Sequence, residues 1–172
     1  MFYNLLAPYA AKFHVANLFT YISFRSGLAI LMSMSICFLI GPRLIAYLRS
    51  KQKHGQPIRD DGPESHFDKA GTPTMGGLMI ISSTTISTLC FANLSNPYIW
   101  VSLFVLLTFG ALGFIDDYTK VSKNNYHGIS GKTKLIIQFL VSVVAFVVIQ
   151  YYSKPEFATQ LTFPFFKHLV LD

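Results

Sequence analysis

The chain has 172 residues, of which 52% are hydrophobic and 13% are charged, and its mean hydropathy is +0.44. A soluble domain spreads more charge over its surface, so this composition excludes one and indicates a single membrane domain over residues 1–172. The formal net charge of +6 would suit nucleic acid, but the basic residues flank the apolar stretches instead of forming one patch. We therefore expect no nucleic-acid partner.

Long uncharged stretches predict four transmembrane helices and an all-α fold. Residues 26–42, 70–115 and 135–153 carry no charged side chain, over 17, 46 and 19 positions respectively. A helix needs about 20 apolar residues to cross a bilayer core, and a helix lets a single span pair its own backbone polar groups. The polar turn at residues 93–97 divides the longest stretch. The predicted spans are residues 21–48, 74–94, 98–118 and 134–152.

The positions of the basic residues predict how these spans are oriented. Lysine and arginine accumulate in cytoplasmic loops of membrane proteins. Ten of the fourteen lie in the loops 49–73 and 119–133 or just inside the spans that border them: Arg43, Arg49, Lys51, Lys53, Arg59, Lys69, Lys120, Lys123, Lys132 and Lys134. We therefore expect loops 49–73 and 119–133 to be cytoplasmic and the tail 153–172 to be external. Within the tail, the aromatic and partly alternating residues 159–170 favour short extended structure or an interfacial segment over a fifth span.

The strongest chemical feature is the carboxylate pair Asp116-Asp117, which ends the longest uncharged stretch. Carboxylates at the C-terminal end of a helix lie beside the partial negative charge of its last carbonyls, so they call for a cation. Lys120 can pair with either one, at i+4 or i+3. Mg²⁺ would serve the same purpose and would also bring phosphate oxygens to the site. The alternative is a helix that ends in water with two solvated acids and a lysine partner.

Other residues near the pair would suit an anionic lipid substrate. Asp117 shares a helix face with Gly113 and Gly110, where missing side chains would admit a lipid chain or another helix. Lysines at cytoplasmic span ends could hold phosphates as point charges, or could serve only to set the topology; they are Lys69, Lys120 and Lys132. The segment 72–77 opens the second span and offers a threonine cap.

These motifs resemble the N-terminal half of the phospho-N-acetylmuramoyl-pentapeptide transferase family, which belongs to the polyprenyl-phosphate phospho-sugar transferases. The resemblance covers essentially the whole chain. It rests on YISFR at 21–25, GPR at 41–43, RDDGPESH at 59–66, GTPTMGG at 71–77, GFIDDY at 113–118 and GKTK at 131–134.

The resemblance implies a reaction, a location and a larger fold. The family transfers phospho-MurNAc-pentapeptide from UDP-MurNAc-pentapeptide to undecaprenyl phosphate, which gives lipid I and UMP in peptidoglycan synthesis, and it needs Mg²⁺. Its members lie in the bacterial cytoplasmic (inner) membrane, surrounded by membrane lipid, as ten-helix bundles with cytoplasmic active-site loops.

The resemblance also implies roles for particular residues. Asp116 and Asp117 match the family's catalytic aspartate pair and are assigned to the metal as well, whereas Lys69, Lys120 and Lys132 match lysines suited to the diphosphate. Because the family's later motifs are missing, we expect an incomplete enzyme that is inactive alone. A complementing C-terminal half and a second copy of the chain in a homodimer are its candidate partners, and an inactive remnant is the alternative. The competing hypothesis is a non-catalytic membrane scaffold or transporter module.

Overall fold

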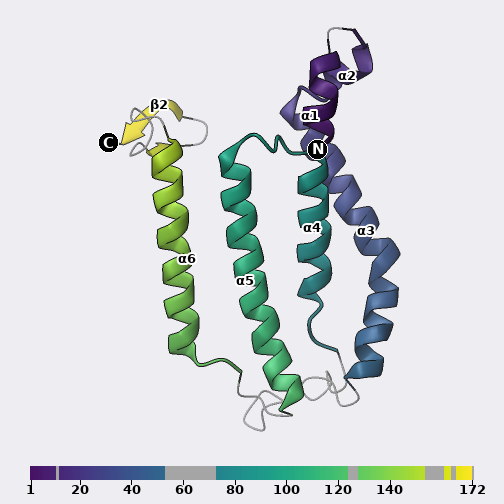
Figure 1. Cartoon of the computed structure of the whole chain (residues 1–172), viewed down its shortest axis with the longest axis vertical. Coiled ribbons are helices and arrows are strands. Elements are labelled where there is room, and N and C mark those ends of the chain that lie inside the picture. Colours follow the sequence, from purple (N-terminus) through teal and green to yellow (C-terminus); the bar gives the residue numbers. More distant parts are fainter. Residues whose placement is uncertain (11, 53–72, 124–127, 154–160, 164–165, 172) are drawn as a thin grey trace.

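The computed structural model describes residues 1–10, 12–52, 73–123, 128–153, 161–163 and 166–171. The described part consists of helices followed by a short hairpin (Figure 1). In chain order its elements are α1 (Phe2–Leu6), the 3₁₀ turn η1 (Ala7–Tyr9), α2 (His14–Leu18), α3 (Ile22–Lys51), α4 (Gly77–Phe91), α5 (Pro97–Ser122), α6 (Gly131–Tyr152), β1 (Leu161–Phe163) and β2 (Phe166–Leu171).

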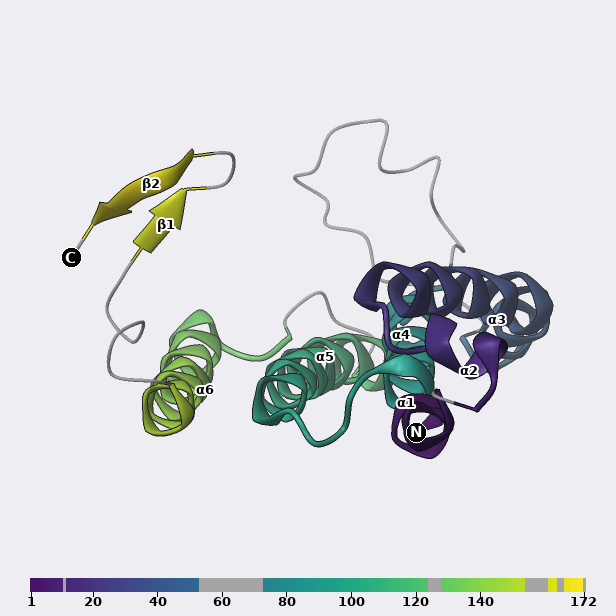
Figure 2. The same cartoon turned by 90° about the horizontal axis from the view of Figure 1, so that it is seen from above.

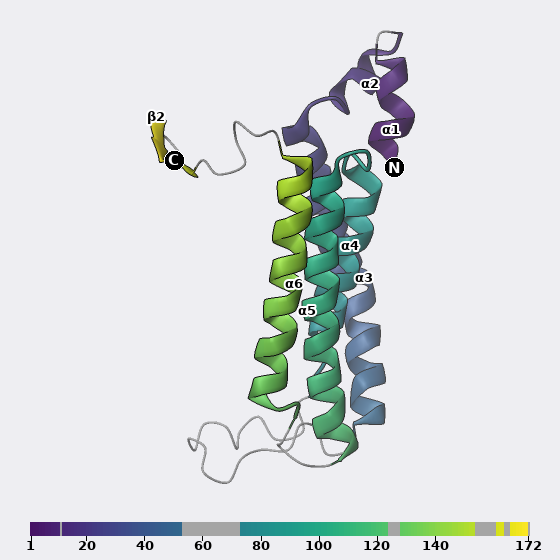
Figure 3. The ribbon, with the colours of Figure 1, turned by 60° about the vertical axis from the view of Figure 1, so that its left-hand side comes forward.

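The four longer helices stand side by side in chain order. Seen from above, α6, α5, α4 and α3 follow one another across the molecule (Figure 2). Seen from the side, they run up and down along a common direction (Figure 3). Consecutive helices are therefore antiparallel, and the C-terminal ends of α3 and α5 share one end of the molecule with the N-terminal ends of α4 and α6 (Figure 1). This shared end is the one that carries Asp116 and Asp117.

Three of these helices are long and apolar enough to cross a membrane. They are α3, α5 and α6, with 30, 26 and 22 residues. Helix α4 is equally apolar but has only 15 residues, which gives it a length of about 22 Å at 1.5 Å per residue. A bilayer core is roughly 30 Å thick. The structure thus supports a multi-pass helical membrane protein, while the count of four spans stays a prediction.

Helix α4 is short because the chain before it is not helical. Met75 has a φ of 71°, a left-handed conformation that few residues other than glycine adopt. The helix begins at Gly77, and its N-cap residue Gly76 makes no side-chain cap bond. The expected threonine cap is therefore wrong, and the hydroxyl of Thr74 bonds to α5 instead.

Small and polar residues join α3 to α4. The Ser83 side chain is fully buried, and its hydroxyl lies 3.2 Å from Ser33 Oγ and 3.1 Å from Cys37 Sγ. Gly41 faces Met79, whose Sδ would lie 3.0 Å from a Cβ added to the glycine. Helices in lipid associate through such close approaches and hydrogen bonds. Cys37 thus takes part in the packing of α3 against α4.

Helices α4 and α5 also approach closely. A Cβ at Gly110 would lie 2.5 Å from Ile81 Cδ1. The prediction that missing side chains on this face of α5 admit another helix is confirmed at this position.

The tail departs from an all-α fold. Strand β1 pairs with β2 in an antiparallel hairpin. The prediction of short extended structure after the last helix is confirmed, and the all-α class is wrong for this segment.

Candidate functional site

Asp116 and Asp117 lie near the C-terminal end of α5 and turn toward different neighbours. Consecutive residues of a helix diverge by about 100°, so one carboxylate lies toward α6 and the other toward the segment that precedes α4. Asp116 is buried, with 7% of its surface exposed, and Asp117 is partly buried. The two carboxylates therefore differ in partners and in access.

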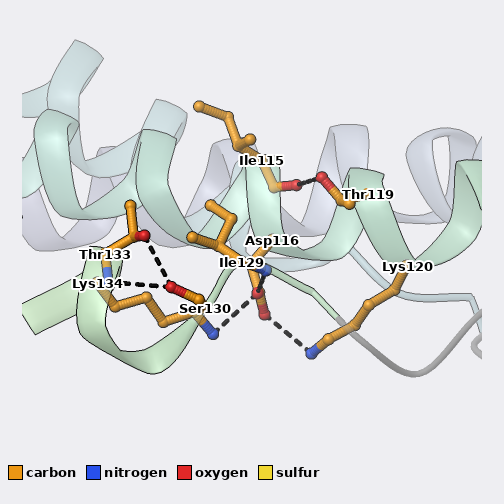
Figure 4. A network of polar contacts seen from close by, with 8 residues as sticks. All are labelled: Ile115, Asp116, Thr119, Lys120, Ile129, Ser130, Thr133 and Lys134. Carbon is orange, nitrogen blue, oxygen red and sulfur yellow. Dashed lines mark hydrogen bonds and ion pairs between the residues drawn. The ribbon is translucent and has the colours of Figure 1, made fainter.

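Three donors hold the carboxylate of Asp116 (Figure 4). Lys120 Nζ lies 2.9 Å from Oδ2, and Lys134 Nζ lies 2.8 Å from Oδ1. The backbone N–H of Ile129 also donates to Oδ1, at 2.7 Å. Two ammonium groups and one amide satisfy both carboxylate oxygens and tie the end of α5 to the start of α6.

The chain before α6 packs directly against this carboxylate. A Cβ at Gly128 would overlap Asp116 Oδ1, and it would lie 2.6 Å from Asp116 Cγ and 2.9 Å from Lys120 Cε. Only glycine leaves room for this approach. Two residues later, the Ser130 hydroxyl caps α6 by accepting a hydrogen bond from Thr133 N at 3.2 Å. The cap starts the first turn of the helix that carries Lys134.

Asp117 has a different set of contacts. The Thr74 hydroxyl donates to Asp117 Oδ2 at 2.7 Å. Thr74 is held in turn by Gln52, the C-cap residue of α3: Thr74 N donates to Gln52 Oε1 at 2.9 Å, and Gln52 Nε2 donates to Thr74 O at 3.3 Å. Gln52 is buried, with 7% of its surface exposed. Asp117 is thus connected through Thr74 to the end of α3.

A pocket of about 270 Å³ opens beside Asp117, between α4 and α5. No atom lies within 4 Å of a Cβ added to Gly113, so the missing side chain leaves open space there. The pocket is lined by Met75, Gly77, Leu78, Ile81, Phe109, Gly110, Gly113, Phe114, Asp116 and Asp117. It therefore combines an apolar wall with the aspartate pair at one end.

The structure brings together some of the predicted site residues. Lys120 pairs with Asp116, which is one of the two pairings that its spacing allowed. Lys132 is exposed, and within the described residues it makes no ion pair with either aspartate. Lys69 lies outside the described residues, so its position stays a prediction.

The structure also adds residues that the sequence analysis did not select. These are Lys134, Ile129, Gly128, Thr74 and Gln52. Lys134 lies in the motif GKTK and Thr74 in the motif GTPTMGG, so these motifs could have indicated both residues. Nothing in the sequence singled out Gln52.

Comparisons with known proteins show which proteins the chain resembles. Residues 69–81 match the model described as phospho-N-acetylmuramoyl-pentapeptide-transferase signature 1. The whole chain is 56% identical to the protein named phospho-N-acetylmuramoyl-pentapeptide-transferase from Rickettsia prowazekii (strain Madrid E), of which it covers 47%. The namesakes from Rickettsia akari (strain Hartford) and Rickettsia felis are 56% and 55% identical over the same 172 residues. Over its whole length the chain is therefore similar to one part of these transferases.

The chain spans about half the length of the curated transferases that it matches. In the structure, the transferase signature coincides with the side of the site that α4 supplies. Within 69–81 lie Thr74, which bonds to Asp117, and Ile81, which packs against Gly110. Met75, with its left-handed backbone, lies there too. The signature therefore describes how the start of α4 meets α5.

Proposed function

We propose that this chain forms part of the cytoplasmic active site of a phospho-N-acetylmuramoyl-pentapeptide transferase. The reaction is the attack of an undecaprenyl phosphate oxygen on the sugar-bound phosphorus of UDP-MurNAc-pentapeptide, which breaks the bond to UMP and yields lipid I. One observation carries the proposal: a chain 56% identical to such transferases over its full length places an aspartate pair and two lysines at one end of its helices.

Asp117 is the better candidate for contact with substrate. Its Oδ2 accepts one hydrogen bond from a hydroxyl, and the side chain lines the open pocket. A carboxylate in this position would accept the proton of the lipid phosphate, or hold that phosphate through a metal ion. The pocket's apolar wall suits the first isoprene units of a lipid.

Asp116 is better suited to building the site than to reacting. Both of its oxygens are engaged, and two ammonium groups lie within 3 Å of them. Its role in this proposal is to hold Lys120 and Lys134 and to fix the start of α6 against α5. Lys132 and Lys69 remain the proposed point charges for the diphosphate.

The described residues fit Mg²⁺ through one aspartate only. An ion at Asp116 would face the positive charge of Lys120 and Lys134, whereas among the described residues Asp117 has one donor, the neutral Thr74 hydroxyl. No group of three or more His, Cys, Asp or Glu side chains that could hold a metal occurs among the described residues. Mg²⁺ keeps several waters and takes few protein carboxylates when phosphates complete its shell. We propose Asp117 as one such ligand, with the bound ion neutralising phosphate charge.

The orientation follows from the charge asymmetry. Loops 49–73 and 119–133 would face the cytoplasm of a bacterial inner membrane, where the nucleotide sugar arrives. The lipid phosphate would reach the same end from within the bilayer. Phosphoryl transfer depends on positioning and on charge neutralisation, and both are available where α3, α4, α5 and α6 meet.

A chimera tests this function. The 172 residues replace the matching part of the Rickettsia prowazekii relative, and purified chimera is assayed for UMP release from UDP-MurNAc-pentapeptide with undecaprenyl phosphate and Mg²⁺. We expect turnover that requires all three. A chimera that inserts and folds but releases no UMP, while the intact relative does, would favour the non-catalytic membrane module.

A further inference from the structure

The Gln52 side chain makes two hydrogen bonds to the backbone of Thr74, a residue that belongs to no helix or strand. Thr74 precedes α4, so neither its N–H nor its C=O belongs to a helix ladder. The Gln52 amide accepts from the former at 2.9 Å and donates to the latter at 3.3 Å. Backbone groups that are removed from water need such partners. Turning the amide over would place like groups together at both contacts, so the two bonds together fix its orientation.

The next residue shows how tightly this segment is constrained. Met75 keeps a φ of 71° while 8% exposed, and a non-glycine residue persists in that region only where its surroundings impose it. Gln52 holds the residue before Met75. On the other side, Leu78 N donates to Met75 O and Met79 N donates to Gly76 O, both at 3.1 Å. The turn into α4 is thus fixed at both of its ends.

The Thr74 hydroxyl transmits this constraint to Asp117. Oγ1 donates to Asp117 Oδ2 at 2.7 Å, and a hydroxyl can make that bond only if the Thr74 backbone holds its Cβ at the right place. Within the described residues, no other hydrogen bond to the Asp117 carboxylate occurs. Its rotamer therefore depends on Thr74, and Thr74 depends on Gln52.

We infer that Gln52 is a positioning residue for Asp117, acting through Thr74. This inference rests on the proposed function, because it takes Asp117 as the carboxylate that meets the substrate. Gln52 is the C-cap residue of α3, its side-chain hydrogen bonds within the described residues go to Thr74, and it is not among the residues that line the pocket. It sets the direction of one carboxylate oxygen and leaves the other for substrate or metal.

Amide hydrogen exchange tests the clamp, that is, the two hydrogen bonds between the Gln52 side chain and the Thr74 backbone, without any assay of activity. In this chain, reconstituted in detergent, Gln52→Met removes both polar contacts and keeps the length of the side chain. We expect the Thr74 amide to exchange at least tenfold faster in this variant. Thr74→Val keeps the backbone contact, so residue 74 should stay protected. Unchanged exchange in Gln52→Met would overturn the inference.

Kinetics of the chimera separate positioning from simple structural support. Gln52→Met and Thr74→Val should each lower kcat about tenfold or more with little change in KM for the nucleotide substrate. Thr74→Ser keeps the hydroxyl and should retain most of the parent's kcat. Because the two residues act in series, the double variant should be about as slow as the slower single variant. Thr108→Val, which removes a hydroxyl from the middle of α5, is the matched control.

The possible failures are distinguishable. If the parent chimera is inactive, the proposed function fails, and the exchange experiment still decides whether the clamp exists. If the parent is active and Asp117→Asn is not, full activity in Gln52→Met refutes the positioning role alone. Multiplicative losses in the double variant, accompanied by a lower Tm, would show ordinary destabilisation instead.

Discussion

Asp116 and Asp117 are adjacent in sequence, yet their carboxylates are tied to different helices. Asp116 bonds to Lys134 and Ile129 at the start of α6, whereas Asp117 bonds to Thr74 before α4. The pair therefore joins three helices at one end of the molecule. It follows that replacing one aspartate should have consequences unlike those of replacing the other.

Asp117→Asn should abolish most of the transferase activity of the chimera and leave its stability nearly unchanged. The substitution keeps the shape and can still accept from Thr74, but it removes the charge. We expect activity to fall on the order of a hundredfold or more, the scale of one acid-base or electrostatic group. UMP release and a thermal unfolding curve measure both effects. Asp61→Asn, outside the described residues, is the charge-matched control. An equally mild loss of activity at both positions would show that Asp117 is an ordinary charged residue at a helix end.

Asp116→Asn should act mainly on stability. Its carboxylate is buried between two ammonium groups, and a neutral amide would leave them without a counter-charge. We expect a loss of about 2 kcal/mol, in the range of a hydrogen bond to a charged group. Thermal or denaturant unfolding in detergent gives the value. A variant as stable as the parent would mean that the Asp116 ion pairs are not formed in solution.

Gly128→Ala should destabilise the junction between α5 and α6. The added methyl group would overlap the Asp116 carboxylate, and the loss should be roughly 1–3 kcal/mol, as in other overpacked sites. Gly131→Ala is the matched control, because nothing lies within 4 Å of its Cβ. At the start of a helix, alanine should be neutral or stabilising by about 0.5 kcal/mol. Equal effects of the two substitutions would contradict the close approach at Gly128.

Filling the pocket should affect activity before stability. Gly113 faces open space between α4 and α5, so Gly113→Leu can be accommodated there without displacing protein atoms. We expect Tm to stay within a few degrees of the parent and UMP release to fall at least tenfold. Gly27→Leu, also in open space but on α3, should leave activity intact. Full activity in Gly113→Leu would exclude this pocket from the reaction.

Cysteine labelling tests the orientation. In a background without Cys37 and Cys90, Lys123→Cys and Ser95→Cys place single thiols at opposite ends of α5, both at exposed positions. In sealed cells, a membrane-impermeant maleimide should label residue 95 and spare residue 123 until the membrane is opened. Labelling of residue 123 from outside would reverse the topology.

Much of the fold could be predicted from the sequence because lipid imposes simple rules. Uncharged stretches located the helices, and a polar turn ending in proline located the break between α4 and α5. The length of α4 could not be predicted, since hydropathy continues through residues 74–76 while the backbone does not. The left-handed Met75 makes the helix begin later, at Gly77, than composition indicates.

Some contacts of the candidate site could likewise be predicted from the sequence, and others could not. Spacing along one helix was enough to foresee the pairing of Lys120 with Asp116. Contacts between helices, such as Lys134 with Asp116 and Gln52 with Thr74, depend on the distance and rotation between segments. No local pattern encodes those quantities. Lys132 shows the reverse case, because a motif residue two positions before Lys134 is exposed and makes no ion pair with that carboxylate among the described residues.

The contacts of Ser83 and Gly41 between α3 and α4 set where α4 lies along α3. A helix about 22 Å long is shorter than a bilayer core of roughly 30 Å. Matching of hydrophobic lengths would therefore not hold such a helix at one level in lipid. Ser83 bonds to Ser33 and Cys37, and Gly41 faces Met79 at close range. These contacts are compatible with one alignment of α4 along α3. Since Thr74 lies just ahead of α4, that alignment also sets the level at which its hydroxyl meets Asp117 of α5. A few small side chains midway along two apolar helices thereby influence the hydrogen bond of a carboxylate at their far end.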